Sequence, residues 1–217
     1  MARPQTLLQP RKTPVQARSA HTVEAIHTAC IQVLLDGGME RLSTTRVAAR
    51  AGVSVGSLYQ YYPNKQSLLA AVLQKHLLNV VEAVEASCLR AKGQPVAVMA
   101  ASLVQAFIAA KFAAPDVSRA LYAVASEVRG EAVVARLTQR SQLALCDMLA
   151  TAADRHFGDL APISFVLSTA VVGPVQALLA SSAAEPVIER VREHLVAMVL
   201  AYLRQMGSEV VARRAPR

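Results

Sequence analysis

Segment 43–65, with the sequence STTRVAARAGVSVGSLYQYYPNK, gathers side chains that suit contact with a polyanion. Its second half predicts a short helix whose outward face carries Val55, Gly56, Ser57, Tyr59, Gln60 and Tyr61. Small residues at the start of this face permit a close approach to a nucleic-acid backbone, and the hydroxyl groups can donate hydrogen bonds to phosphate oxygens. The chemistry that these residue types indicate is contact with double-stranded DNA.

Two short helices joined by a tight turn must position these side chains. They are predicted over about 44–51 and 55–61, because each segment lies between a capping residue and a stop. The caps and stops are Ser43 or Thr44, Gly52, Ser54 and Pro63. Residues that can pack the two helices against each other and the core are Val47, Ala48, Ala51, Val53 and Leu58. This arrangement is a helix-turn-helix unit.

Longer helices flank this unit. The preceding helix starts at Thr13 or nearer Ser19 and ends at Gly37-Gly38, and Asn64 caps a long helix that reaches about Arg90. Further helices are predicted over 95–112, 116–129, 131–156, 162–182 and 185–206, with no alternating strand pattern and no internal repeat. The predicted fold is all-α: an N-terminal three-helix DNA-binding domain, joined by a long helix to a larger helical domain.

Composition narrows the function classes. A hydrophobic fraction of 53% and a mean hydropathy of +0.33 exclude a disordered chain. Segment 163–184 is apolar, but Gly173 and Pro174 interrupt it, which favours a buried helix over a membrane span. The first twenty residues are basic and contain no apolar core of a secretory signal, so we expect a soluble, cytoplasmic protein with no membrane partner.

Positive charge is concentrated near the N-terminus. The net charge is +8, and residues 1–65 carry 8 Lys or Arg against 3 Asp or Glu, whereas residues 66–217 carry 15 against 12. Such a basic patch is typical of a surface that meets phosphate. Arg11 and Lys12, in a basic arm over residues 1–12, either follow the duplex or its minor groove or belong to a solubilising tail.

Catalytic and metal-binding patterns are missing from the sequence. Cys30, Cys88 and Cys146 are scattered, which fits buried thiols in a reducing compartment and leaves a redox role open. His27 and Cys30 share a helix face, but no further ligands cluster with them, so burial is favoured over a metal site. The chain has no G-x-S-x-G, phosphate-binding loop or dinucleotide fingerprint, and we expect neither enzymatic activity nor a cofactor.

Residues 19–75 resemble the DNA-binding region of the TetR (tetracycline-repressor-like) family of transcriptional regulators. The resemblance rests on the helix that ends in Gly37-Gly38 and on LSTTRVAARAGVSVGSLYQYYPNKQSLL after it. It implies that the supporting helix contacts DNA through Thr44, Thr45 and Arg46, and that the major groove receives Val55, Gly56, Ser57 and Gln60. It also implies phosphate contacts by Tyr59, Tyr61 and Lys65, whereas Tyr62 is expected in the core. Arg46 can pair with guanine and Gln60 with adenine.

The same resemblance implies a dimer. The last two long helices would pack against their copies through small residues and an apolar stripe, unless these faces only close the monomer's own core. The small residues are Ser168, Ala170, Gly173, Ala177 and Ser181, and the stripe is Leu195, Met198, Val199 and Tyr202. One short recognition helix reads too few bases to be selective, so a homodimer on a palindromic operator with half-sites about 34 Å apart is expected.

In this family the middle helices enclose a pocket for a small-molecule effector. Candidate lining residues are Met99, Phe107, Phe112, Tyr122, Met148 and Phe165, with Gln105, Arg119, Glu127 and Gln142 as polar contacts. Plain core packing is the simpler alternative for each apolar residue. Because aromatic residues make up 4% of the chain and Trp is absent, an aliphatic pocket for an acyl chain or small hydrophobe is favoured over an aromatic cage.

The domain boundaries expected from these patterns are 1–12 for the basic arm, 13–65 for the helix-turn-helix domain, 66–207 for the ligand-binding and dimerisation domain, and 208–217 for a basic tail. The expected function is sequence-specific regulation of transcription, with repression that a small hydrophobic effector relieves. Two alternatives remain: a non-specific architectural DNA-binding protein and an amphipathic protein of a membrane surface.

Overall fold

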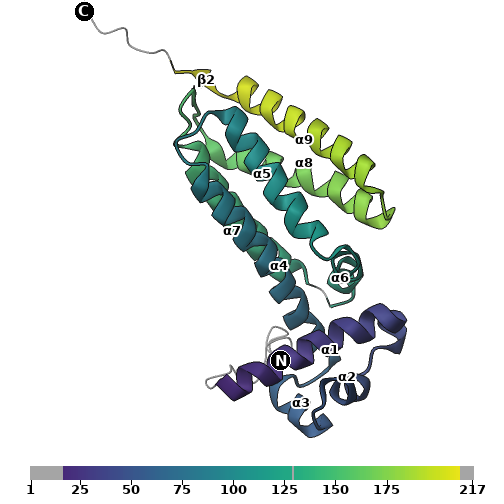
Figure 1. Ribbon diagram of the computed structural model, residues 1–217. Coiled ribbons are helices and arrows are strands. Elements are labelled where there is room, and N and C mark those ends of the chain that lie inside the picture. The colour runs from purple at the N-terminus through teal and green to yellow at the C-terminus, as the bar shows by residue number, and fades with distance from the viewer. Residues whose placement is uncertain (1–16, 129, 211–217) are drawn as a thin grey trace, which may run out of the picture. The chain divides into compact units, whose positions relative to one another are not determined.

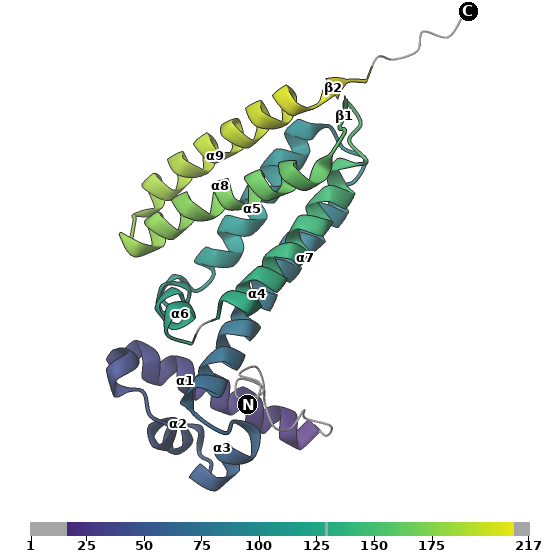
Figure 2. The ribbon, with the colours of Figure 1, turned by 180° about the vertical axis from the view of Figure 1, so that it is seen from behind.

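The computed structural model describes residues 17–128 and 130–210, and these residues are almost entirely helical. Figures 1 and 2 show the elements from two sides. The helices are α1 (Ala17–Arg41), α2 (Thr44–Ala51), α3 (Val55–Tyr61), α4 (Lys65–Arg90), α5 (Val96–Phe112), α6 (Pro115–Glu127), α7 (Glu131–Leu149), α8 (Leu160–Ala180) and α9 (Glu185–Met206). Two short strands, β1 (Arg155–His156) and β2 (Ser208–Glu209), pair antiparallel. The predicted all-α fold is confirmed.

Capping side chains begin the short helices where the sequence predicts. Ser43 Oγ accepts the Arg46 N–H at 3.3 Å, and Ser54 Oγ accepts the Ser57 N–H at 3.0 Å. Each bond satisfies a backbone donor that the first turn of a helix leaves unpaired. Asn64 Oδ1 caps α4 in the same way, accepting the Ser67 N–H at 2.7 Å.

Glycines in the left-handed region end α1 and α2. At Gly38, φ is 65° and ψ is −171°, so the regular helix breaks there and one further turn leads to Arg41. At Gly52, φ is 68°, and its N–H turns back to the carbonyls of Ala48 and Ala49. The predicted ends of both helices are confirmed, whereas a start of α1 at Thr13 lies outside the described residues.

The prediction of one helix over 131–156 is wrong beyond Leu149. Thr151 Oγ1 donates to the Met148 carbonyl at 2.6 Å, and Asp154 Oδ1 accepts the Val96 N–H at 2.8 Å. Such side-chain bonds to the backbone compete with helix continuation. The second bond forms only because α5 begins next to this turn, so the sequence of α7 alone does not reveal it.

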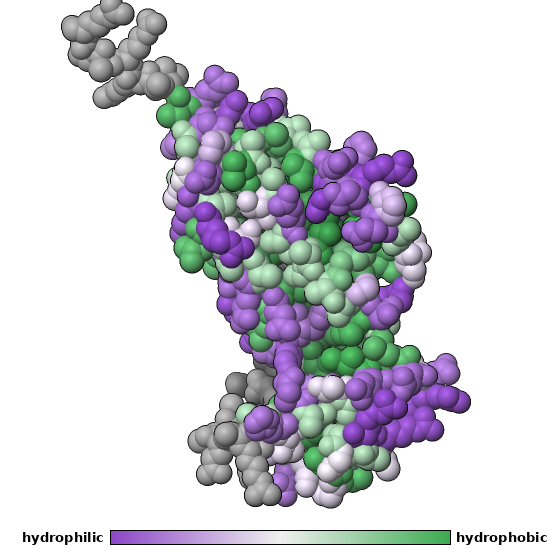
Figure 3. Space-filling model, viewed as in Figure 1, coloured by the Kyte–Doolittle hydropathy of each residue, from purple (hydrophilic) through white to green (hydrophobic). Residues whose placement is uncertain are grey.

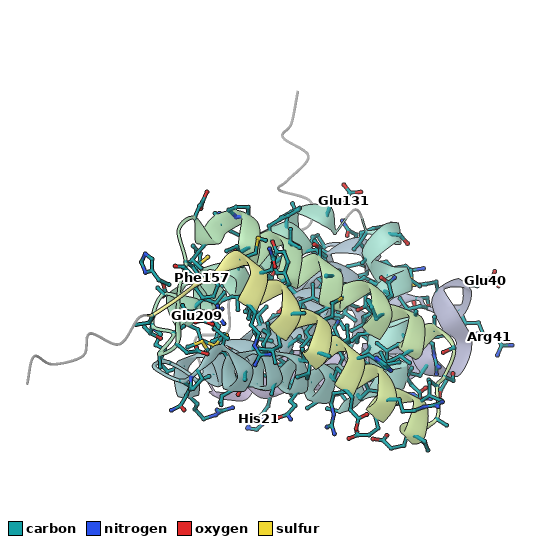
Figure 4. The ribbon with its side chains drawn as sticks, turned by 90° about the horizontal axis from the view of Figure 1, so that it is seen from above. His21, Glu40, Arg41, Glu131, Phe157 and Glu209 are labelled. Atoms are coloured by element: carbon teal, nitrogen blue, oxygen red, sulfur yellow. The ribbon has the colours of Figure 1, made fainter. Side chains whose placement is uncertain are left out.

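The chain after this turn pairs with the chain after α9. A side chain at Gly207 would place its Cβ only 2.8 Å from Phe157 Cε1, so the close approach requires glycine. Figure 4 shows Phe157 and Glu209 at the same end of this part of the chain. Arg155 donates to Glu209 Oε1 at 3.1 Å and adds an ion pair to the two-stranded contact.

The chain divides into two compact units. Unit 1 comprises Met1–Leu77 and Asp116–Val134, and unit 2 comprises Leu78–Pro115 and Ala135–Arg217. Unit 1 therefore contains the first half of α4, α6 from Asp116 onward and the first turn of α7 in addition to the helix-turn-helix, whereas the sequence predicts a domain boundary near residue 65. In unit 2, α5 contacts α8 and α9, and Arg140 on α7 pairs with Glu85 on α4 at 2.5 Å.

Two described helices, α4 and α8, are long and apolar enough to cross a membrane by length and composition. Within their most apolar stretches, 50% of the residues of α4 and 39% of those of α8 are buried inside the protein. Burial thus accounts for much of the apolar character of α4, whereas α8 keeps a largely exposed apolar face.

Candidate nucleic-acid interface

A small apolar core holds α2 and α3 together in unit 1. Val47, Ala48 and Leu58 are each fully buried, and Val53 packs partly against the same cluster. These are the residues that the sequence predicts at the contact between the two helices, and their burial confirms the helix-turn-helix unit. Because α3 spans only Val55–Tyr61, its orientation depends on this packing.

The outer face of α3 is narrower than the sequence predicts. Gly56, Tyr59 and Gln60 are exposed, and Ser57 is half-buried. Val55 and Tyr61, expected to face outward, are half-buried against the core of unit 1. The correction follows from the 100° step of a helix, which carries the first and last residues of a seven-residue segment back toward the side of Leu58.

Two of the predicted DNA contacts lie next to each other. Thr44 Oγ1 on α2 and the phenolic oxygen of Tyr59 on α3 form a hydrogen bond at 3.1 Å. Thr45 and Arg46 are exposed beside them at the start of α2, whose backbone N–H groups form the positive end of a helix dipole. Hydroxyl donors and a positive helix end therefore combine at one edge of the unit, which suits a phosphate oxygen.

Arginines extend this edge along α2. The guanidinium of Arg46 donates to the Arg41 carbonyl at 3.3 Å, and Arg50 pairs with Asp36 at 2.5 Å. Glu40 and Arg41 project outward from the end of α1 (Figure 4), within the hydrophilic surface that covers this end of α1 (Figure 3). Arg41 and Arg50 were not among the predicted DNA contacts, although Arg50 follows Arg46 by four residues on the exposed side of α2.

Lys65, expected to contact a phosphate, makes a hydrogen bond within unit 1 in the absence of DNA. Its Nζ donates to the Met39 carbonyl at 3.0 Å, at the end of α1. Burial raises the pKa of the Cys30 thiol to about 12, and the positive charge of Lys65 acts in the opposite direction. The hydrogen bond to Met39 directs the ammonium toward the end of α1.

Tyr62 lies in the core of unit 1, as predicted, where its hydroxyl meets His27. The imidazole Nε2 of His27 lies 2.7 Å from the phenolic oxygen, and both side chains are buried. Burial and, to a smaller extent, the charge of the nearby Lys75 lower the pKa of His27 to about 4, while Glu24 acts in the opposite direction. His27 is therefore neutral at physiological pH, and Glu24 forms an ion pair with Lys75 beside it.

Two of the three cysteines are buried, as the sequence indicates, whereas Cys146 is half-buried. Cys30 and Cys88 are the two buried ones, and burial raises the pKa of the Cys88 thiol to about 11. Thiols with such pKa values are protonated at neutral pH and poorly nucleophilic. Within residues 17–128 and 130–210, no three His, Cys, Asp or Glu side chains gather in a way that could hold a metal ion.

The residues expected to line an effector pocket do not share one environment. Met99 and Met148 are fully buried in unit 2, Phe107 and Phe112 are half-buried there, and Tyr122 belongs to unit 1. Phe165 is 58% exposed on α8, so its assignment to an internal pocket is wrong. Its place in the apolar run of α8 gave no sign of which side faces outward.

The polar candidates are similarly dispersed. Gln142 on α7 donates to Ser168 Oγ on α8 at 2.9 Å, and Arg119 pairs with Asp116 on its own helix. Gln105 lies in an open groove of about 490 Å³ between α4 and α5 in unit 2. The groove is otherwise lined by Ser87, Arg90, Ala91, Gln94, Val98, Ser102, Ala106 and Ala109. The side chain of Glu127 lies outside the described residues.

Helices α8 and α9 leave an apolar face exposed. On α8 the exposed face includes Phe165, Val166 and Val172 with the small residues Gly173, Ala177 and Ser181, while Ser168 and Ala170 are half-buried. On α9, Met198 is 42% exposed and Tyr202 is half-buried, whereas Leu195 and Val199 are buried within unit 2. The expectation that Leu195 and Val199 belong to an intermolecular stripe is therefore wrong.

Two family models match most of the chain. Residues 26–72 match the model for bacterial regulatory proteins of the tetR family, and residues 95–203 match the tetracyclin repressor-like C-terminal domain. The chain is 49% identical over 43 residues to the nucleoid occlusion factor SlmA of Pasteurella multocida, covering 18% of this chain and 22% of that protein. It is 41% identical over 54 residues to the class C tetracycline repressor protein of Escherichia coli, covering 25% of each chain. The chain thus matches only about a quarter of the length of these relatives.

The fold is shared more widely than the sequence. A TetR-family transcriptional regulator of Mesorhizobium loti superposes with a TM-score of 0.73 at 18% identity, covering 89% of this chain and 100% of that one. The fatty acid degradation regulator FadR of Bacillus halodurans superposes with a TM-score of 0.66 at 16% identity, covering 89% and 98%. At these identities the likeness establishes the fold alone.

Proposed function

The chain belongs to the TetR family of DNA-binding transcriptional regulators, and from that premise we propose that it is a sequence-specific repressor that acts as a homodimer. The observation that carries this proposal is the exposed face of α3, with Gln60 and Tyr59 outward and Leu58 fully buried behind them. A rigid, short helix with a polar outer face can enter a major groove, where side chains reach base edges.

We assign the contacts by their chemistry. Gln60 reads a base, and Gly56 permits close approach of the DNA because it is exposed and has no side chain. The Thr44–Tyr59 hydroxyl pair, Thr45 and Tyr61 contact phosphates, whereas Ser57 and the exposed edge of Val55 face the major groove. Arg46 serves a phosphate or a guanine.

The homodimer would form through α8 and α9. A side chain as large as Phe165 at 58% exposure, beside Val166 and Val172, is an apolar surface that water disfavours. Gly173 and Ala177 on the same exposed side permit two helices to approach closely. Two copies joined there would present two recognition helices to a palindromic operator.

The effector would be a small hydrophobic molecule bound in unit 2. The buried side chains of unit 2 are predominantly aliphatic, among them Val84, Met99, Leu103 and Met148. Such side chains suit an alkyl group better than a planar cation. Repression would be relieved if the effector favours a dimer geometry whose recognition helices no longer match the half-site spacing. The absence of enzymatic activity and a cytoplasmic location belong to the same proposal.

Binding of the purified protein to DNA that flanks its own gene tests this function. Fluorescence anisotropy at near-physiological salt with excess competitor DNA should give binding about a thousandfold tighter than to random duplex. If that DNA binds weakly, an operator is selected from random duplexes. Failure of the selection, together with a steep salt dependence and no sequence preference, would leave the architectural alternative.

Effector release is measured with the operator in hand. Acyl compounds of graded chain length should lower the anisotropy of the operator complex, whereas planar cationic dyes should not. Release by planar cationic dyes but not by acyl compounds would contradict the proposal of an aliphatic effector site.

A further inference from the structure

A buried hydrogen bond joins the end of the recognition helix to α1. Nε2 of His27 lies 2.7 Å from the phenolic oxygen of Tyr62, with ring centroids 5.7 Å apart. The exposed fractions are 8% for His27 and 2% for Tyr62. Tyr62 is the C-cap of α3, and its backbone N–H donates to the Leu58 carbonyl at 2.9 Å. The bond therefore connects the C-cap residue of the recognition helix to a residue 35 positions earlier in the chain.

Helix α3 needs such anchors because it is too short to fix its own orientation. It has seven residues, fewer than two turns. Ser54 caps its start, Leu58 packs beneath its centre, and Tyr62 holds its end. Tyr59 and Gln60 lie in the last turn, next to the Tyr62 anchor. A tilt at that end would displace both side chains from whatever they contact.

Packing alone does not account for this pair. His27 Nδ1 is buried and has no hydrogen-bond partner among the described residues, so the imidazole is buried at a cost. An apolar side chain of similar size would fill the same space without that cost. What His27 supplies and an apolar residue cannot is a directional bond to the Tyr62 hydroxyl. The lowered pKa of His27 keeps the ring neutral at physiological pH, and Nε2 then accepts or donates this bond according to the tautomer.

We propose that His27 is a positioning residue for DNA recognition: through its hydrogen bond to the Tyr62 hydroxyl it fixes the tilt of α3 and thereby the placement of Gln60 and Tyr59. This inference rests on the proposed function, since it concerns how the same helix reads its operator. It adds to that function a residue of α1 that touches no DNA.

Three variants separate positioning from stability. Tyr62→Phe and His27→Phe each remove one partner, and the double variant removes both polar groups. Each single variant should bind the operator about tenfold more weakly, while binding to random duplex changes less than about twofold. The dependence of affinity on salt should not change, because no phosphate contact is lost.

The double variant decides between the two roles. Replacing both partners by apolar rings leaves no buried group unpaired, so the melting temperature should recover toward that of the native protein. Operator affinity should remain low, because the directional bond is still absent. Recovery of operator affinity together with stability would overturn the inference, as would native operator selectivity in all three variants.

Val124→Ala is the matched control. Val124 is fully buried on α6 in the same core and belongs neither to α3 nor to the His27–Tyr62 pair, so its truncation lowers stability and leaves that hydrogen bond in place. At a temperature where every variant is folded, it should leave the ratio of operator to random-duplex affinity unchanged. A fall in that ratio equal to the one in Tyr62→Phe would mean that any loss of stability has this effect, and the inference would fail.

Amide exchange in the DNA-free protein keeps the two proposals distinguishable. If the native protein does not discriminate among duplexes, the proposed function fails, yet the anchor is still measurable. The amides of Leu58 and Tyr62 should exchange about tenfold faster in Tyr62→Phe than in Val124→Ala of equal global stability. Equal exchange rates would overturn the positioning role.

Discussion

The ammonium of Lys65 donates a hydrogen bond to the backbone carbonyl of Met39, 3.0 Å away. Met39 lies directly after Gly38, where regular helix geometry breaks, so its carbonyl has no ordinary helical partner. The bond thus ties the start of α4 to the end of α1. It gives Lys65 a role inside unit 1 that its position in the sequence motif did not indicate.

Lys65→Met should therefore change stability more than DNA binding. The variant keeps the aliphatic stem and removes the donor to Met39, which should lower the free energy of unfolding by about 1 kcal/mol. Urea denaturation measures this loss. The slope of log affinity against log salt should stay unchanged, whereas a slope reduced by about one would restore the phosphate contact expected from the sequence.

Gln60→Ala should reduce selectivity. Loss of a bidentate contact to adenine should weaken operator binding by about 1–3 kcal/mol and relax the preference at one base pair of each half-site. Competition among operator variants in an anisotropy assay measures both effects. The Gln66→Ala variant, an exposed glutamine on α4, serves as control and should bind like the native protein. An equal loss on random duplex would assign Gln60 to the DNA backbone instead.

Gly52→Ala should destabilise unit 1 through backbone strain alone. Its φ of 68° lies in the left-handed region, and nothing lies within 4 Å of a Cβ built there. The expected cost is about 1–2 kcal/mol in the free energy of unfolding. Gly158→Ala is the matched control, since Gly158 is equally open and not left-handed, and it should be nearly neutral. If the two variants lower the melting temperature equally, the positive φ of Gly52 is not the cause of the destabilisation.

Acid should destabilise unit 1 through His27. The folded pKa of about 4 lies below the ordinary 6.5, so the unfolded chain binds more protons between these values. Stability from this group is fully present above pH 6.5 and is lost as the pH falls toward 4, by about 3 kcal/mol in total. The hydrogen bond from Lys75 lowers the pKa of the nearby Glu24. Protonation of Glu24 in acid therefore also lowers the free energy of unfolding.

Urea denaturation of the native protein and of His27→Phe at pH 7 and pH 4.5 measures this contribution. The difference in unfolding free energy between the two pH values should be smaller in the variant. An identical pH dependence would show that His27 titrates normally in the folded protein.

Phe165→Glu should convert the proposed homodimer to a monomer. A charge in the centre of the exposed apolar face of α8 would be buried without a partner when two copies associate. Sedimentation equilibrium measures the change. Leu143→Glu on α7 is the control, because Leu143 is 61% exposed but lies outside α8 and α9. If both variants remain dimeric, α8 does not form the interface.

The helix-turn-helix was predictable because its signals are local. Ser43, Gly52 and Ser54 set helix ends through bonds within a few residues, and Val47 and Leu58 face inward by helical periodicity. The outward face of α3 was predicted less well. Whether Val55 and Tyr61 are exposed depends on how far the core of unit 1 extends around a short helix.

Contacts between segments that are distant in the chain could not be predicted from the sequence. The end of α7 at Leu149 depends on Asp154 reaching Val96, and the bond of Lys65 to Met39 joins residues 26 positions apart. Phe165 was expected inside a pocket and is exposed, whereas Leu195 was expected at a dimer interface and is buried. Both predictions failed because α8 and α9 are apolar on more than one side. Periodicity then does not select which side turns inward.

The sequence by itself determined an all-helical chain, the bounds of α2 and α3 and the family of regulators to which it belongs, because caps, glycines and apolar spacing act over one or two helical turns. The tertiary structure alone decided which apolar face of α8 stays exposed, where Lys65 points, and that His27 meets Tyr62. Each of these depends on the free energy of packing segments that are remote in sequence, and no local pattern encodes that free energy.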